Sequence, residues 1–243
     1  MALDPIPSAE SSFALQVERF YASLIATTDF NFNSEPSLGG RLLYVGQLND
    51  GARAIVVAAN IAGAATLTAS ADAELGKQAM RDGVVDFLVT SLDEALRILK
   101  NEIRKRETVA VCVALAPEIV EQEMRERGVQ PDLARPVEFV APEELLTWRV
   151  ASSPTHWLPR MDAIALDCLD SEPASARRWI RLAPRYLGRL AQNLRLLRCS
   201  NETAAIIREQ IQQQVTRGEI GVLVELWISS AEHFESCCFT PPD

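Results

Sequence analysis

The sequence has few of the residues from which metal centres and covalent catalytic sites are built. Its 243 residues include only two histidines, and its five cysteines form no C-x-x-C pair. A structural zinc site is therefore not expected. There is also no nucleophile elbow, no phosphate-binding P-loop and no zinc-protease helix. We expect no metal, and the motifs assign no catalytic residue.

Long apolar runs are also missing. The most apolar stretch, residues 54–71, is too short to span a membrane and contains Asn60. Residues 1–12 have neither a basic cluster nor an apolar core, so no secretory signal is expected. A net charge of −9 argues against general nucleic-acid binding. We expect a cytoplasmic protein with no membrane and no nucleic-acid partner.

Short apolar runs alternate with amphipathic runs between Gly39 and Leu133. The expected buried strands are residues 41–46, 63–69, 84–89 and 109–115. The expected helices are residues 52–62, 72–80, 90–106 and 117–127, the second with Asp72 as its N-cap and the last stopped by Gly128. This alternation predicts an α/β fold, a doubly wound, mostly parallel Rossmann-like sheet with helices on both faces.

The flanking segments extend this core. Residues 1–38 form an N-terminal helix and arm, and an apolar face is expected along the helix of residues 11–25, at Phe13, Val17, Phe20, Tyr21 and Leu24. Strands are expected at residues 137–140 and 162–168, separated by a short helix at 142–148. An extra C-terminal helical section, residues 172–217, contains helices at 174–198 and 201–217. A strand at 220–228 then joins the same sheet, so residues 39–243 are expected to form one domain.

The core resembles the central NAD-binding domain of urocanase (urocanate hydratase). The matching fragments occur in the same order over roughly 95 residues: Gly39–Leu43, Ala62-Gly63, Asp72, Gly83, Ser91–Leu96, Arg127–Val129 and Pro131-Asp132. The resemblance implies an enzyme that holds NAD tightly and uses the nicotinamide ring as an electrophile to add water across urocanate.

The departures from the family pattern fall in the loops that form its site. The sequence Gln47-Leu-Asn-Asp-Gly-Ala52 replaces a glycine-rich loop, whose backbone would approach a pyrophosphate closely. Ser70 occupies the position of an acidic residue that would bind ribose hydroxyls. Residues 115–118 and 135–142 also differ in type. The chain is therefore interpreted as a relative that has lost urocanate hydration.

The residues that remain in these loops are the candidate cofactor-binding residues Gly46, Asn49, Asp50, Gly51, Ser70 and Asp72. Asn-Asp-Gly is also a favoured turn, so turn formation is a competing explanation for residues 49–51. No cofactor is expected, and NAD is the one that the resemblance allows.

Two functions follow from this interpretation. The favoured one is a binding or assembly module that acts through a small ligand or nucleotide, or as a homodimer. The alternative is a lyase or hydratase-like enzyme with retained NAD or nucleotide binding, for which His156 is a further candidate. The second histidine, His233, lies beyond the last expected strand.

Two other features have structural explanations. Seven arginines in the expected helix at 174–198 are interpreted as solvated and paired with the acidic surplus, the alternative being a phosphate or nucleic-acid site. They are Arg177, Arg178, Arg181, Arg185, Arg189, Arg195 and Arg198. The pair Cys237-Cys238 is interpreted as incidental, the alternative being a redox-active pair.

Overall fold

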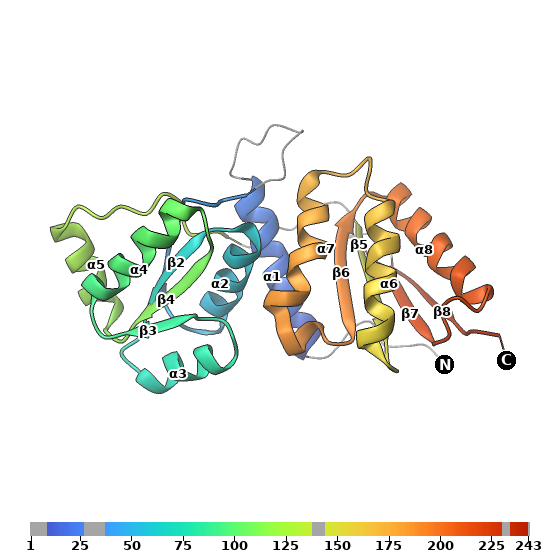
Figure 1. Cartoon of the computed structure of the whole chain (residues 1–243), viewed down its shortest axis with the longest axis horizontal. Coiled ribbons are helices and arrows are strands. Elements are labelled where there is room, and N and C mark those ends of the chain that lie inside the picture. The colour runs from blue at the N-terminus through green and yellow to red at the C-terminus, as the bar shows by residue number, and fades with distance from the viewer. Residues whose placement is uncertain (1–8, 27–36, 138–143, 230–233, 243) are drawn as a thin grey trace. The chain divides into compact units, whose positions relative to one another are not determined.

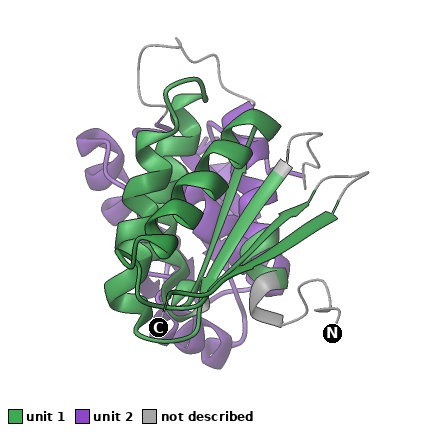
Figure 2. Ribbon diagram, turned by 90° about the vertical axis from the view of Figure 1, so that its right-hand side faces the viewer, with its two compact units in different colours: residues 1–15, 31–35, 140–243 green, residues 16–30, 36–139 purple. Residues whose placement is uncertain are grey.

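The computed structural model describes residues 9–26, 37–137, 144–229 and 234–242, and it divides into two compact units (Figures 1 and 2). One unit comprises Gln16–Phe30 and Pro36–Phe139 and is called the parallel unit. The other comprises Met1–Leu15, Asn31–Glu35 and Val140–Asp243 and is called the antiparallel unit. Residues 39–243 are expected from the sequence to form one domain, whereas each unit has its own four-stranded sheet.

The parallel unit contains the sheet predicted from the sequence. Its strands are β1 (Leu42–Gln47), β2 (Ala65–Ala69), β3 (Phe87–Val89) and β4 (Val109–Val113), in the spatial order β1-β2-β4-β3. All three pairings are parallel. The intervening helices are α2 (Asp50–Ala62), α3 (Ala73–Arg81), α4 (Leu92–Lys105) and α5 (Pro117–Glu126). The prediction of an α/β fold with a parallel sheet and helices on both faces is confirmed.

Local capping signals set the helix bounds in this unit. The side chains of Asn49, Asp72 and Ser91 accept hydrogen bonds from backbone N–H groups at the starts of α2, α3 and α4. Gly63 ends α2 in the left-handed conformation (φ 93°), which costs glycine little. Asp72, Ser91 and Gly63 lie at or beside bounds expected from the sequence, whereas Asn49 caps a helix that begins two residues before the expected start at residue 52.

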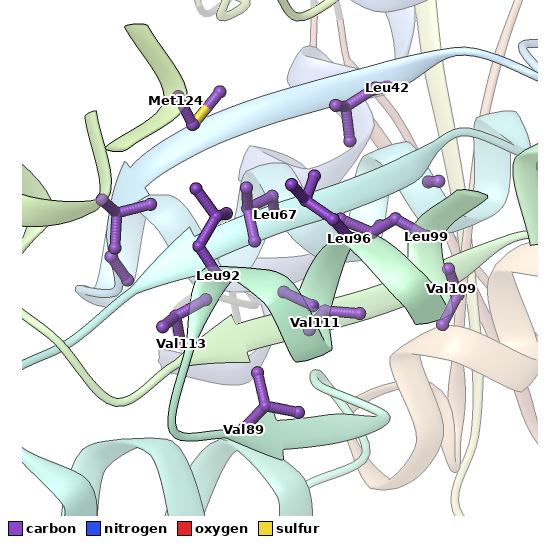
Figure 3. Packing of buried hydrophobic residues seen from close by; sticks show 14 residues of the cluster. Leu42, Leu67, Val89, Leu92, Leu96, Leu99, Val109, Val111, Val113 and Met124 are labelled. Carbon is purple, nitrogen blue, oxygen red and sulfur yellow. The ribbon is translucent and has the colours of Figure 1, made fainter. Parts of the chain in front are cut away.

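A close-packed core lies between the sheet and α4 and α5 (Figure 3). Leu67 of β2 and Val111 of β4 are directly paired and fully buried, and Leu92 and Leu96 of α4 belong to the same cluster. Leu88 of β3 points to the opposite face, where its side chain lies against Gly76 of α3. Side chains of successive strand residues therefore pack on opposite faces of the sheet, as is expected for a sheet that helices cover on both sides.

The antiparallel unit has a sheet of its own, which the sequence pattern does not predict. Its strands are β5 (Glu144–Val150), β6 (Leu194–Cys199), β7 (Val224–Ser229) and β8 (Phe234–Phe239), in the spatial order β6-β5-β7-β8. Its helices are α6 (Pro154–Asp167), α7 (Ala174–Leu187), the short 3-10 helix η1 (Gly188–Ala191) and α8 (Asn201–Thr216).

Several predictions for this part of the chain are wrong. The expected helix at 142–148 is strand β5, because Leu146 and Trp148 are buried in the middle of a sheet. The expected strand at 162–168 is the second half of α6, in which Leu158, Met161 and Ala165 follow helical spacing and are buried. The expected helix at 174–198 ends at Leu187, and strand β6 follows.

The remaining predictions outside the parallel sheet have mixed outcomes. The helix expected at 201–217 is α8, whereas the strand expected at 220–228 is β7 and lies in the antiparallel sheet instead of extending the parallel one. The expected strand at 137–140 lies largely outside the described residues. Helix α1 (Ala9–Ala26) covers the helix expected at residues 11–25. Its residues Val17, Phe20, Tyr21 and Leu24 are buried, and Phe13 is half-buried.

None of the helices in the described part of the chain has an apolar stretch that could span a membrane.

Candidate functional site

The structure brings the six candidate residues to one edge of the parallel sheet. Gly46, Asn49, Asp50 and Gly51 lie where β1 leads into α2, and Ser70 and Asp72 lie where β2 leads into α3. The two strands are neighbours, and the Leu48 N–H donates to the Ala69 carbonyl at 2.9 Å. This is the carboxyl edge of the sheet, where open α/β sheets bind ligands.

Three of the four polar side chains among these residues, those of Asn49, Ser70 and Asp72, already have partners within the protein. Asn49 Oδ1 accepts from the Ala52 N–H at 2.9 Å, and Asp72 Oδ1 accepts from the Glu74 N–H at 2.9 Å. The Ser70 hydroxyl donates to the Asp72 carbonyl at 3.0 Å, and Ser70 is 2% exposed. Asn49 and Asp72 are therefore helix caps, and Ser70 belongs to a turn. The competing explanation of turn and cap formation accounts for their contacts.

The two glycines differ in what they contribute. Gly46 has φ 83° and lies at an irregularity of the β1–β2 ladder, so a side chain there would be strained. Gly51 lies in the first turn of α2, and a Cβ atom built on it would meet no atom closer than Asn49 Oδ1 at 3.6 Å. Only Gly46 of this pair has a backbone conformation that favours glycine.

The order of the strands places the topological switch point of the sheet elsewhere on the same edge. Helices α4 and α5 cover one face of the sheet, whereas α2 and α3 lie on the other (Figure 1). After β2 the chain therefore continues into α3 on one face, whereas after the neighbouring strand β4 it continues into α5 on the opposite face. This point is the topological switch of the sheet, and its rims are residues 70–72 and 114–116. The rims consist of Ser70, Ala71, Asp72, Ala114, Leu115 and Ala116.

Carboxylates dominate the electrostatics of this edge. Each of the four helices that begin there has an acidic residue in its first turn: Asp50 in α2, Glu74 in α3, Asp93 and Glu94 in α4, and Glu118 in α5. A helix N-terminus attracts anions, and here protein carboxylates already complement the partial positive charge. The arrangement disfavours a diphosphate and is compatible with a neutral or cationic ligand.

Two residues near this edge were missed as site candidates because only the fold brings them there. A Cβ atom built on Gly46 would lie 3.8 Å from Nη1 of Arg135, so a guanidinium lies beside the end of β1. The Tyr44 hydroxyl lies 3.4 Å from Oε1 of Glu121 and 3.5 Å from the Pro117 carbonyl. Burial, together with the charge of Glu121, raises the pKa of Tyr44 strongly, so this phenol stays protonated and can donate its O–H to Glu121.

The remaining candidates lie outside the parallel unit or outside the described residues. His156 is exposed in α6 of the antiparallel unit, where its ring packs edge-on against Trp157 with centroids 4.6 Å apart. His233 lies outside the described residues. Among the residues that the structure describes, no group of three or more histidine, cysteine or acidic side chains is placed to hold a metal ion.

The arginines and cysteines are distributed over several elements. Arg177 pairs with Asp170, and Arg195 of β6 pairs with Asp162 at 3.0 Å. Cys237 and Cys238 are neighbours in strand β8, so their side chains point to opposite faces of the sheet. Burial and the adjacent Glu235 raise the pKa of Cys237, which disfavours the reactive thiolate.

A groove of about 840 Å³ lies away from the carboxyl edge. Its lining includes Phe87 and Thr108, at the starts of β3 and β4, and Arg97 and Asn101 of α4. The candidate residues of the carboxyl edge do not contribute to it.

A parallel sheet with helices on both faces and a topological switch point at its carboxyl edge is the architecture of the Rossmann-like class of domains. Residues 17–136 match the model of the urocanase Rossmann-like domain. This half of the chain is thus a urocanase-related Rossmann-like domain, and the resemblance read from the sequence is confirmed. The match begins within α1, upstream of the first fragment recognised from the sequence, Gly39. A search of curated proteins finds no match to the chain.

The residues that carry this resemblance mainly determine the path of the backbone. Gly83 and Gly128 have φ values of 73° and 64° at turns that follow helices, and Ser91 caps α4. Asp132 accepts a hydrogen bond from the Leu42 N–H at 2.7 Å and so fastens the following segment to β1. The features shared with urocanase are thus features of the scaffold.

Proposed function

We propose that this protein is a urocanase-related binding or assembly module that has lost urocanate hydration. The observation that carries the proposal is the composition of the carboxyl edge, where each of the four helices that begin there has an acidic residue in its first turn. A dinucleotide needs free N–H groups and positive potential at that place. The module acts in the cytoplasm as a homodimer, with a small neutral or cationic molecule as its ligand class.

NAD fits the residues of this edge poorly. The Asn49 side chain already occupies the Ala52 N–H, and Asp50 adds a negative charge where a pyrophosphate would lie. Ser70, at the expected ribose position, is buried, and its hydroxyl donates to the Asp72 carbonyl. Phosphate binding by a helix start would therefore displace a cap and bring two negative groups together. We derive no reaction that uses NAD.

One observation favours the alternative, an enzyme with retained NAD or nucleotide binding. Arg135 places a cation beside Gly46, which is the glycine with positive φ at the end of β1. A guanidinium there is suited to a single phosphate group. The catalytic residues of such an enzyme are unassigned.

Thermal unfolding with and without NAD tests the proposal. A ligand present at a hundred times its dissociation constant adds about 2.7 kcal/mol, which shifts the unfolding midpoint by roughly 5 to 15 °C. We expect no shift with NAD and no consumption of urocanate when both are supplied. The matched control is Arg97→Ala. A shift with NAD that is lost in Arg135→Ala but kept in Arg97→Ala would establish the alternative instead.

A further inference from the structure

The structure protects the edges of its two sheets unequally. An exposed strand edge offers unpaired N–H and C=O groups to another chain, and proteins usually cover it, shorten it or place charges on it. The outer edge of β1 is covered, because Leu133 forms a parallel bridge with Leu43, and the Asp132 side chain bonds the Leu42 N–H. The outer strand at the other end of that sheet, β3, is only three residues long.

In the antiparallel sheet, the edge at β6 is also protected. The indole N–H of Trp179 in α7 donates to the Leu196 carbonyl at 2.6 Å. The Arg195 guanidinium in addition donates to the carbonyls of Ala191 and Leu194, at 2.5 and 3.0 Å. These bonds occupy backbone acceptors that a second chain would need.

Strand β8 has none of these protections within the described residues. It is six residues long and pairs with β7 alone. Its sequence, Phe-Glu-Ser-Cys-Cys-Phe, contains no lysine, arginine, proline or glycine. Phe234, Ser236 and Cys238 are exposed along one face, and Phe234 keeps 43% of its surface accessible.

The one charged residue of β8 is already neutralised by its own chain. Glu235 projects to the other face from Phe234, Ser236 and Cys238, and its Oε1 accepts a hydrogen bond from Arg208 of α8 at 2.5 Å. Two copies of β8 can therefore approach without the repulsion of like charges that would keep other edges apart.

We propose that β8 is a homodimer interface, at which a second copy of this chain adds its own β8 in antiparallel orientation. A self-complementary edge is sufficient for a two-fold dimer, the commonest form of oligomer. A two-fold axis perpendicular to the sheet keeps the same face of both strands on the same side. Phe234, Ser236 and Cys238 of the two copies then meet on one surface, and the two four-stranded sheets become one sheet of eight strands.

The β8 interface rests on the proposed function only in that it says how the module assembles. It does not depend on whether the carboxyl edge of the parallel sheet binds NAD. Failure of the NAD test leaves it unaffected, and failure of the dimer test leaves the loss of hydration unaffected. The two proposals are tested by separate measurements.

The test compares oligomeric state by size-exclusion chromatography with light scattering, over a range of protein concentrations and under reducing conditions. We expect the unmodified chain to form dimers whose fraction rises with concentration, because a strand edge is a small interface. The double variant Ser236→Lys and Cys238→Lys places like charges opposite each other across the two-fold axis. It should weaken dimerisation by about tenfold or more. The control is Gln212→Lys, a lysine at an exposed position of α8, and it should dimerise like the unmodified chain.

Hydrogen exchange of the unmodified chain gives a second readout that does not depend on the folding of any variant. Backbone amides of residues 234–239 should exchange more slowly at high protein concentration than at low concentration. A chain that stays monomeric throughout, or a dimer that the double lysine variant leaves intact, overturns the proposal.

Discussion

Leu67→Ala should destabilise the parallel unit more than almost any other single truncation in it. Leu67 is fully buried in the cluster between the sheet and α4 (Figure 3). The substitution removes three carbon atoms, worth about 0.8 kcal/mol each in transfer from water, or roughly 2.4 kcal/mol. The neighbours come from a strand on each side and from a helix, so they cannot close the space fully, and a cavity penalty adds to this loss. We expect a total of about 3 to 4 kcal/mol.

Urea unfolding followed by far-ultraviolet circular dichroism measures this loss. Tryptophan fluorescence is unsuitable, because all four tryptophans belong to the antiparallel unit, at positions 148, 157, 179 and 227. With a urea dependence of about 2 kcal/mol per molar, the midpoint should fall by about 1.5 to 2 M. Leu75→Ala is the control, since Leu75 in the same unit is 46% exposed and should change stability by about 0.5 kcal/mol or less. A loss below about 1 kcal/mol for Leu67→Ala would refute the packing described for this core.

Two further predictions concern backbone space and ionisation. Gly39→Ala should lower the free energy of unfolding by about 1 to 3 kcal/mol, because its Cβ would lie 2.8 Å from the Arg106 carbonyl oxygen. The control Gly51→Ala should be neutral or stabilising, and equal unfolding midpoints for the two variants would contradict this difference. The hydrogen bond from Arg53 lowers the pKa of Asp82, so the pair stabilises the fold at neutral pH and loses this effect as the pH falls below about 4. Arg53→Met should raise the Asp82 pKa toward its ordinary value in a carbon-13 NMR titration, while Arg97→Met should leave it unchanged; an unmoved pKa in Arg53→Met would show that the pair is not formed in solution.

The sequence predicted the parallel unit well because its signals are local. Buried strands such as Val109–Val113 read as continuous apolar runs, and Asp72 and Ser91 mark helix starts through bonds to residues two or three positions away. The antiparallel unit lacks comparable signals. Strand β6 follows a helix that also contains leucine and arginine, and Gly188, with φ 55°, is the only glycine in the segment of residues 188–193 between them.

The geometry of the site depended on contacts that no local pattern encodes. The switch between β2 and β4 follows from the order of strands in space, which places β4 between β2 and β3. The proximity of Arg135 to Gly46 likewise joins residues that are far apart along the chain. The candidate residues themselves were found because they follow strand ends directly. Their use as helix caps became evident only from the hydrogen bonds.

The bridge at Leu133 also bears on where the chain can be cut. The N–H groups of Asp132 and Leu133 both donate to the Leu42 carbonyl, so the first strand of the sheet is completed by a segment some ninety positions downstream. Proteolysis or recombinant truncation ahead of Pro131 would strip β1 of these bonds and leave its flank open to pairing with foreign strands. A shortened version of the urocanase-related half should therefore retain residues through at least Leu133 to remain monodisperse.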